Sequence, residues 1–391
     1  MLSIADIVEA VAFPYTVWRT LRGVEVEMCG SRPLYVTGNA AVTFRARVDG
    51  RRKALKCYLR TNDRLEVIYG SPYLRNELCV VDMVGRYHWV DCLVLDYVEG
   101  KTLDEALCEA TEPEQFAALA TAFDAFASEL LSSPRAHGDL KPENIIVKED
   151  GSMQAIDWDA AFVPSLAGRE AREIGTAAYQ HPLRDRRMYD KHIDDYSIAF
   201  LSTMLHMMSL SRAWVDYYRH RHEPLYMPKE FIGYASCDCS EAMQQVSRLF
   251  AQRGMARCYR IARLLNSSRP YIADLERIIT LAWQPPEQGV ETTLEWGEHG
   301  WWGCRCGQRW VIPPLYTSGF EPVGGYALMK LGKVAHLLSL DSGDMLYSFG
   351  EEVRVAMLGD GRLRIREQDA EPRIIEIEEL INSSKKSIFA E

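Results

Sequence analysis

Two short apolar runs, each bordered by acidic or amide residues, constrain the fold of this chain more than any other feature. Residues 137–147 read HGDLKPENIIV, with Asp139, Lys141 and Asn144 ahead of the apolar run. Further on, QAIDWDAAF places Asp157 directly after a second apolar run. Short apolar runs bounded by polar residues are typical of buried strands. The polar residues that border the two runs are predicted to contribute to one site.

The residue types at these positions suit the transfer of a phosphoryl group. Asn144 and Asp157 offer the hard oxygen ligands that magnesium prefers. Asp139 stays free to accept a hydroxyl proton, and Lys141 can neutralise charge on the transferring group. We therefore predict a magnesium-dependent phosphate site.

In order and spacing, these motifs resemble those of the protein-kinase family over about residues 30–283. The resemblance implies that Asp139 is the catalytic base and that Lys141 contacts the γ-phosphate. It also implies that Asn144 and Asp157 hold Mg2+ and that ATP is the phosphate donor.

Motifs upstream resemble the nucleotide-binding half of the same family. In TGNAAVTFRAR, Gly38, Ala41 and Thr43 match the phosphate-covering loop, although Ala41 replaces a glycine. A loop with fewer glycines brings its backbone less close to phosphates, so modest nucleotide affinity is expected. In KALK, Ala54 and Lys56 match the alanine above adenine and the lysine that pairs with the α- and β-phosphates.

Two glutamates are candidates for the partner of Lys56. Glu66 precedes SPYL, which resembles the segment after the partner helix of the family, whereas Glu77 would suit a longer helix. We prefer Glu66, because residues 77–97 read as a β-hairpin with its turn at Gly85.

The stretch CLVLDYVEGKTL resembles the hinge between the two lobes of a kinase. Leu95 matches the gatekeeper position. Asp96, Tyr97 and Val98 are expected to present backbone groups to adenine, because an extended backbone carries alternating donors and acceptors.

Two downstream motifs bear on the class of substrate. GTAAYQHPL resembles the end of an activation segment, with Thr176 and Pro182 kept and Leu183 in place of the usual glutamate. DDYSIAF resembles the helix that supports the catalytic loop, with Asp194 in the anchoring position. Peptide-directed kinases have such a segment and small-molecule kinases generally lack it.

Two departures from the family concern control of activity. Gly138 stands where many kinases carry an arginine that pairs with a phosphorylated activation loop, so activity that is not gated by phosphorylation is expected. Asp157, Trp158 and Asp159 replace Asp-Phe-Gly. Loss of that glycine predicts a loop held in one state.

Residues 301–343 resemble the bacterial WG repeat. Such repeats cannot bury their faces singly, so a compact β module of two or three imperfect units is expected. We predict that it is a protein-interaction surface or a structural cap on the helical region. The matching residues are Trp302, Gly303, Ile312, Pro313, Pro314, Tyr316, Phe320, Gly325, Ala327 and Lys330.

The chain has 391 residues, more than one hydrophobic core usually organises. The patterns predict a helical extension (1–30), a small antiparallel β N-lobe (31–97), a mostly helical C-lobe (98–283) and a β-rich domain (284–391). The expected fold class is α+β, a bilobal protein-kinase-like fold followed by a small β-rich domain.

Charge and apolar content exclude several classes of protein. The net charge of −10 is spread along the chain, which argues against a nucleic-acid partner. An acidic N-terminus and the lack of long apolar stretches predict a cytoplasmic protein without a membrane span. The pairs Cys237/Cys239 and Cys304/Cys306 are spaced too closely for the usual structural zinc site.

The sequence thus predicts a Ser/Thr protein kinase that transfers the γ-phosphate of ATP to protein substrates. Two alternatives remain open. A small-molecule kinase of the aminoglycoside or choline kinase type is motivated by Gly138 and Trp158. A pseudokinase scaffold is motivated by Ala41 and Leu183.

Overall fold

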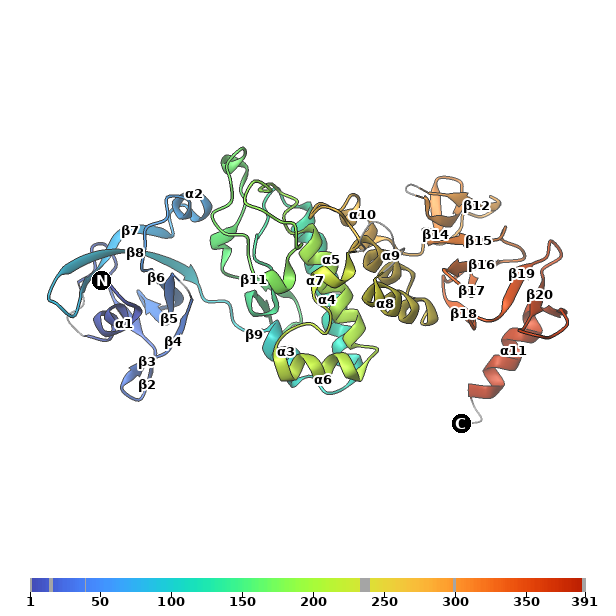
Figure 1. Ribbon diagram of the computed structural model, residues 1–391, viewed down its shortest axis with the longest axis horizontal. Helices are drawn as coiled ribbons and strands as arrows, with labels where there is room; N and C mark the ends of the chain where they lie inside the picture. Colours follow the sequence, from blue (N-terminus) through green and yellow to red (C-terminus); the bar gives the residue numbers. More distant parts are fainter. Residues whose placement is uncertain (1, 14–16, 39, 233–239, 298–299, 389–391) are drawn as a thin grey trace.

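The computed structural model describes residues 2–13, 17–38, 40–232, 240–297 and 300–388. It is a mixed α+β structure with three regions in chain order (Figure 1). An N-terminal β region lies at one end of the molecule, a helical region in the middle and a C-terminal β region at the other end. Among the described residues, every helix is too short or too polar to cross a membrane.

The N-terminal β region is an antiparallel sheet with the strand order β1-β5-β6-β8-β7, and β4 also pairs with β5. Asp49 and Gly50, both with positive φ (49° and 74°), make the tight turn between β5 and β6. The predicted hairpin with a turn at Gly85 is confirmed by the pairing of β7 with β8. The strands are β1 (Val24–Val26), β2 (Met28–Cys29), β3 (Arg32–Pro33), β4 (Tyr35–Thr37), β5 (Ala41–Val48), β6 (Arg51–Tyr58), β7 (Tyr73–Val81) and β8 (Tyr87–Asp96).

Two helices pack against this sheet. Helix α1 (Ile4–Ala12) starts with a capping box between Ser3 and Asp6, and it buries Ile7 and Val11 in the core of the sheet. Helix α2 (Leu65–Tyr69) is much shorter and buries Leu65 against Ala41 and other residues of a second cluster. The length of α2 decides which side chains reach the site described below.

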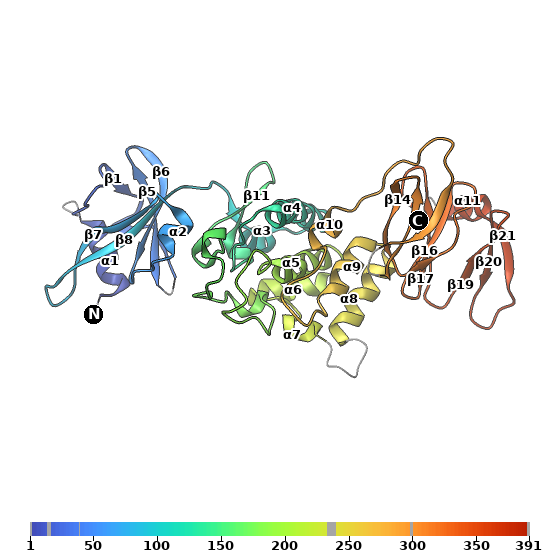
Figure 2. The same cartoon turned by 90° about the horizontal axis from the view of Figure 1, so that it is seen from above.

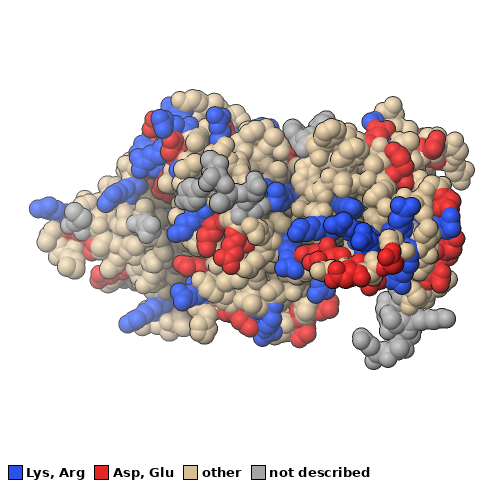
Figure 3. Space-filling view, turned by 45° about the vertical axis from the view of Figure 1, so that its right-hand side comes forward, with Lys and Arg blue, Asp and Glu red and all other residues tan. Residues whose placement is uncertain are grey.

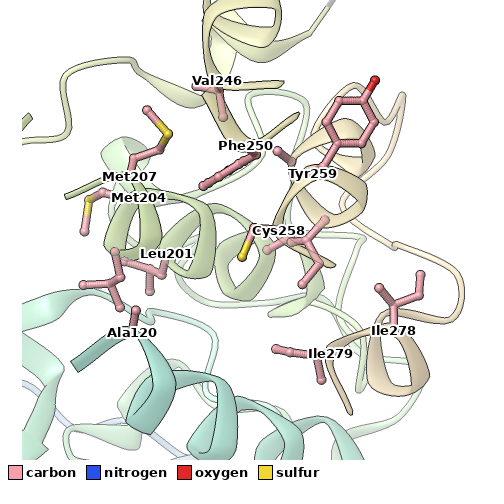
Figure 4. Packing of buried hydrophobic residues seen from close by; sticks show 14 of the residues in the cluster. Ala120, Leu201, Met204, Met207, Val246, Phe250, Cys258, Tyr259, Ile278 and Ile279 are labelled. Atoms are coloured by element: carbon pink, nitrogen blue, oxygen red, sulfur yellow. The ribbon is translucent and has the colours of Figure 1, made fainter. Parts of the chain in front are cut away.

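The helical region is built around α5, whose residues are all buried. Figure 4 shows Leu201, Met204 and Met207 of this helix among residues of α4, α8, α9 and α10. A small antiparallel sheet, β11-β10-β9, lies on the side that faces the N-terminal β region (Figure 1). The helices are α3 (Leu103–Glu109), α4 (Pro113–Ser132), α5 (Asp195–Met208), α6 (Arg212–Arg221), α7 (Pro228–Phe231), α8 (Glu241–Gln252), α9 (Ala256–Leu264) and α10 (Leu275–Thr280). The strands are β9 (Lys101–Thr102), β10 (Ile145–Val147) and β11 (Met153–Ala155), and the 3-10 turns are η1 (Pro142–Asn144), η2 (Trp158–Ala160), η3 (Pro164–Leu166) and η4 (Ala177–Tyr179).

The C-terminal β region consists of three successive antiparallel sheets and a last helix. Its strands are β12 (Thr292–Trp296), β13 (Trp302–Cys306), β14 (Arg309–Tyr316), β15 (Ser318–Gly319), β16 (Tyr326–Leu331), β17 (Val334–Ser339), β18 (Met345–Phe349), β19 (Arg354–Met357), β20 (Arg362–Arg366) and β21 (Arg373–Glu376). Helix α11 (Ile377–Ile388) follows β21. The assignment of this region to WG repeats stays a prediction.

A single hydrophobic cluster joins the helical region to β13, β14 and β16. Arg260 of α9, only 1% exposed, donates to the backbone oxygen of Pro314 at 2.5 Å, and its guanidinium lies 5.3 Å from the ring centre of Trp301. The indole nitrogen of Trp283 donates to the Leu340 oxygen at 2.9 Å. Figure 2 shows that this region packs on the side of the helices away from the N-terminal β region.

Acidic and basic side chains are interspersed on the face shown in Figure 3. Neither sign of charge covers this face continuously. The picture agrees with the even distribution of charge along the sequence.

Candidate functional site

Three charged side chains meet where the N-terminal β region faces the helical region. The ammonium nitrogen of Lys56, on β6, lies 2.6 Å from Oδ1 of Asp157 and 2.8 Å from Oδ2 of Asp159. Burial alone would lower the pKa of Lys56, but the charges and hydrogen bonds of the two carboxylates outweigh it, so the pKa lies above its usual value. Lys56 is therefore a cation fixed between two acids.

Asp159 also accepts two phenolic hydrogen bonds. The hydroxyls of Tyr69, on α2, and Tyr58, on β6, donate to Oδ1 of Asp159 at 2.8 Å and 3.1 Å. Burial, and then the charge of Asp159, raise the pKa of both phenols, so both remain donors. One carboxylate thus connects β6, α2 and the segment after β11.

The structure contradicts the predicted pair between Lys56 and Glu66. Glu66 instead lies 2.7 Å from Arg75 in an exposed ion pair. In the short helix α2, Leu65 and Ile68 form the buried face, and Tyr69 rather than Glu66 is directed to Asp159.

The alternative partner, Glu77, is also placed elsewhere. It is 1% exposed on β7 and accepts hydrogen bonds from the backbone nitrogens of Thr20 and Leu21 and from the Thr20 hydroxyl. This carboxylate fixes the N-terminal segment to the sheet. The sequence signal for the observed partner was the second acid of Asp157-Trp158-Asp159, which stands where a glycine was expected.

Asp139 and Asn144, five positions apart, lie together in one loop. The amide nitrogen of Asn144 donates to the backbone oxygen of Asp139 at 2.9 Å and lies 3.4 Å from its Oδ2. The other carboxylate oxygen, Oδ1, accepts from the backbone nitrogen of Thr176 at 2.6 Å. Segment 175–176 therefore orients Asp139 from outside its own loop.

Asp194 holds the loop that carries Asp139. Its carboxylate accepts hydrogen bonds from the backbone nitrogens of His137 and Gly138, the latter at 2.8 Å. The fully buried ring of His137 contacts the Ile156 oxygen at 2.7 Å, which ties this loop to the segment that carries Asp157. Asp194 therefore fixes the backbone of the loop at His137 and Gly138.

Gly138 occupies a position that only glycine fills without strain. Its φ is +84°, and a Cβ atom there would lie 2.3 Å from the backbone oxygen of Ala160. Its own oxygen accepts from Arg184, a buried arginine that the sequence motifs did not single out. Leu183, next to it, is 60% exposed.

Asp157 has left-handed backbone angles, with φ 61° and ψ 62°. Such a conformation is uncommon outside glycine, although aspartate tolerates it better than most residues. The neighbouring Trp158 is fixed by a hydrogen bond from its indole nitrogen to the Ala155 oxygen at 3.2 Å and by the Arg135 guanidinium, 4.9 Å from its ring centre.

The carboxylates around Lys56 form a negative field that suits a divalent cation. Burial, and then the charges of Asp159, Asp157 and Asp139, raise the pKa of Glu173. The charge of Lys56 acts in the opposite direction on the pKa of Glu173 and is the smallest of these effects. Asn144 and Asp157 carry an amide and a carboxylate oxygen, which are the types of donor that Mg2+ prefers.

The predicted nucleotide-contact residues lie along β5, β6 and the end of β8. Ala41 is buried beneath the turn at Gly38, whose nitrogen donates to the Ala41 oxygen at 2.9 Å. Thr43 pairs with Lys56 across β5 and β6, and Ala54 pairs with Leu95 across β6 and β8. Lys141 is half-buried directly before η1.

A cavity of about 1100 Å³ lies beside the predicted hinge. Asp96, Tyr97 and Val98 line one side, and Val147 and Gln154 also contribute to its wall. Lys56 and Asp157, although described, are not among its lining residues. Asp96, at the end of β8, and Lys56, on the neighbouring strand β6, therefore do not line the same cavity.

Comparison with known proteins gives local similarity to serine/threonine kinases. No protein-family model matches the chain. A stretch of 116 residues is 33% identical to the serine/threonine-protein kinase PknL of Mycobacterium tuberculosis and covers 28% of this chain and 29% of that protein. A stretch of 149 residues is 25% identical to the human serine/threonine-protein kinase 32B and covers 36% of this chain and 34% of that protein. The chain spans about a third of the length of the curated relatives that it matches.

Proposed function

We propose that this protein is an ATP-dependent phosphotransferase with a protein-kinase-like bilobal fold, and that it transfers the γ-phosphate to serine or threonine hydroxyls of proteins. The observation that carries the proposal is two pairs, Asp139 with Asn144 and Lys56 with Asp157. The backbone nitrogen of Ile156 donates to the Asn144 oxygen at 2.9 Å and joins the segments that carry them. The local similarity to serine/threonine kinases supports the same reaction class.

In this proposal Asp139 accepts the proton of the substrate hydroxyl. Its Oδ1 is engaged by the Thr176 nitrogen, whereas Oδ2 has only the long contact of 3.4 Å to Asn144. Oδ2 is therefore the atom that would take the proton. Lys141 would contact the γ-phosphate as the hydroxyl attacks.

Lys56 would bind the α- and β-phosphates, and Asn144 and Asp157 would hold Mg2+. When bound, Mg2+ would neutralise charge on the phosphates. Asp159 serves in this proposal as the positioning residue for Lys56, because it holds the ammonium group without being a metal ligand itself.

The backbone of Asp96 and Val98 would read the edge of adenine from the wall of the hinge cavity. Ala54 would pack on the base, and the turn at Gly38 with Thr43 would cover the phosphates. Since Ala41 is buried in the sheet, its backbone cannot approach phosphate as closely as a glycine would, which supports modest nucleotide affinity.

The same contacts support activity without phosphorylation of the segment around Thr176. Gly138 carries no cation for a phosphate, and its positive φ and the nearby Ala160 oxygen exclude a larger residue. Asp139 is already oriented by the Thr176 nitrogen. Lys56 is held by Asp157 and Asp159, which belong to one segment. Its ion pairs are therefore complete without movement of a helix.

For the C-terminal β region we propose the role of a cap. The hydrophobic cluster that it shares with α9 and neighbouring helices would be exposed to water without it. Binding of a partner protein would be an additional role of its outer sheets.

Incubation of the purified protein with Mg2+ and ATP, followed by mass spectrometry of protein and small-molecule fractions, tests the proposal. Phosphate on serine or threonine is expected. A phosphorylated metabolite alone would instead identify a small-molecule kinase, the alternative motivated by Gly138 and Trp158. Nucleotide binding without any transfer would identify a scaffold.

A further inference from the structure

A second group of metal-ligating side chains lies between α3 and α6, apart from the charged cluster around Lys56. It consists of Asp104 and Cys108 on α3 and of His222, directly after α6. One ligand atom from each lies within 4.8 Å of the others, and within the described part of the chain no other such group of these residue types is found. Figure 1 shows α3 and α6 side by side.

The geometry is close to that of a tetrahedral site. Nδ1 of His222 is 2.9 Å from Oδ1 of Asp104, 3.2 Å from its Oδ2 and 4.0 Å from Sγ of Cys108. With zinc–sulfur and zinc–nitrogen bonds of about 2.3 and 2.0 Å, tetrahedral S and N ligands are about 3.6 Å apart. The distance from Nδ1 of His222 to Sγ of Cys108 is within about half an ångström of this value, and all three ligand atoms lie within 4.8 Å of one another.

The local structure explains why the three side chains converge. Asp104 and Cys108 are one helical turn apart, so they share a face of α3. The hydroxyl of Tyr218 donates to Oδ1 of Asp104 at 2.7 Å and orients the carboxylate. His222 ends α6 in a left-handed conformation with φ 53°.

We propose that Asp104, Cys108 and His222 bind a zinc ion that links α3 to α6. A thiolate, an imidazole and a carboxylate are a ligand set that suits zinc better than magnesium. The His222 side chain is 54% exposed, which leaves room for water as the fourth ligand. Helix α3 also contacts η1, so the ion would brace one side of the loop that carries Asn144.

Cobalt titration of the chain of 391 residues, stripped of metal by a chelator, tests the site. The wild type should give a thiolate-to-cobalt charge-transfer band that zinc abolishes. Cys108→Ser should remove the component of that band that belongs to this site and lower the bound zinc by one equivalent, and His222→Ala should weaken binding at least about tenfold. Cys29→Ser and His220→Ala, both at exposed positions, are the matched controls and should bind as the wild type does.

If Cys108→Ser keeps the complete band and the same zinc content, the site does not exist. A measurement on the wild type guards against misfolding of the variants. Zinc should slow the alkylation of Cys108 several-fold, as read by peptide mass spectrometry, and leave the alkylation of Cys29 unchanged. Equal alkylation of Cys108 with and without zinc would overturn the proposal.

Discussion

Lys56 and Asp159 form an ion pair of 2.8 Å that joins strand β6 to the segment after β11. The acid lies only two positions from Asp157, so one short segment supplies both carboxylates that contact the lysine. Tyr58 and Tyr69 complete the surroundings of Asp159.

Replacement of Asp159 by Asn should lower kcat more than it raises the KM for ATP. Without this carboxylate, Lys56 would pair with Asp157 alone. That ion pair would compete with the proposed role of Asp157 as a metal ligand. A hydrogen bond to a charged group contributes about 1.5–3 kcal/mol, which corresponds to a loss of about 10- to 160-fold. Steady-state kinetics with varied ATP measure both constants.

Glu66→Gln, which alters only the exposed pair with Arg75, should stay within about twofold of the wild type. A larger loss in Glu66→Gln than in Asp159→Asn would restore Glu66 as the functional partner.

Asp139→Asn should abolish transfer and leave ATP binding nearly intact. The proposed base is lost, which lowers turnover by about 10²- to 10⁴-fold. The amide can still accept a hydrogen bond from the Thr176 nitrogen, so the loop should keep its shape. ADP production and binding of a fluorescent nucleotide report the two properties. Glu129→Gln, on the exposed face of α4, is the control, and unchanged turnover in Asp139→Asn would remove Asp139 from its role.

Gly138→Ala should destabilise the protein more than Gly151→Ala does. Both glycines have similar positive φ angles, +84° and +81°, but only at Gly138 would the new Cβ meet a backbone oxygen, that of Ala160 at 2.3 Å. We expect a loss of about 1 kcal/mol for Gly151→Ala from its backbone conformation and at least about 2 kcal/mol more for Gly138→Ala. Urea unfolding measures the difference, and equal losses would show that Ala160 can move away.

The free energy of unfolding should fall as the pH rises from about 6.5 toward 10. His206 lies 2.9 Å from Asp124 in the core between α4 and α5. Burial alone would lower the pKa of His206, but hydrogen bonds to Asp124 and Cys258 outweigh it and raise the pKa to about 10. The imidazole of the unfolded chain has a pKa of about 6.5. The stabilisation is therefore complete below pH 6.5 and is lost as the pH approaches the pKa of His206 in the folded protein.

Urea unfolding at pH 6 and pH 9.5 should show a loss of about 1–3 kcal/mol in the wild type. His206→Gln should lose most of this pH dependence, whereas His220→Gln, at an exposed position, should keep it. An equal slope in His206→Gln and in the wild type would assign the effect to other groups.

Ile312→Ala should lower the stability of the helical region together with that of the C-terminal β region. Ile312 is 2% exposed on β14 within the cluster shared with the helices, and its truncation should cost about 2–4 kcal/mol. Ile374, 52% exposed on β21, is the matched control. Calorimetry should show one transition that moves as a whole. A separate early transition of the C-terminal β region would contradict the shared core.

Features set by neighbouring residues could be predicted from the sequence. A helix near the N-terminus and the hairpin with its turn at Gly85 depend on local patterns, and both are present. Asp139 and Asn144 lie within one loop, so their spacing was enough to bring them together.

Features set by the length of an element or by distant packing could not be predicted. The partner of Lys56 depends on α2 being so short that Tyr69, rather than Glu66, is directed inward. Arg184 is far from Gly138 in the sequence, and only the folding of the chain brings its guanidinium to the Gly138 oxygen. The local sequence pattern also predicts that residues 284–391 form a domain separate from the helices. In the structure, one hydrophobic cluster contains residues of both regions.

The shared core has a consequence for how a substrate could be selected. A domain on a flexible linker can search a large volume, but the C-terminal β region is fixed to α9 through Arg260 and Pro314. A partner held by its outer strands, β19 to β21, would stay at a constant distance from the side of the helical region where β11 lies, across the helices from those strands (Figure 2). Only a substrate long enough to span that region could occupy both places, so the length of the substrate would become a criterion of its recognition.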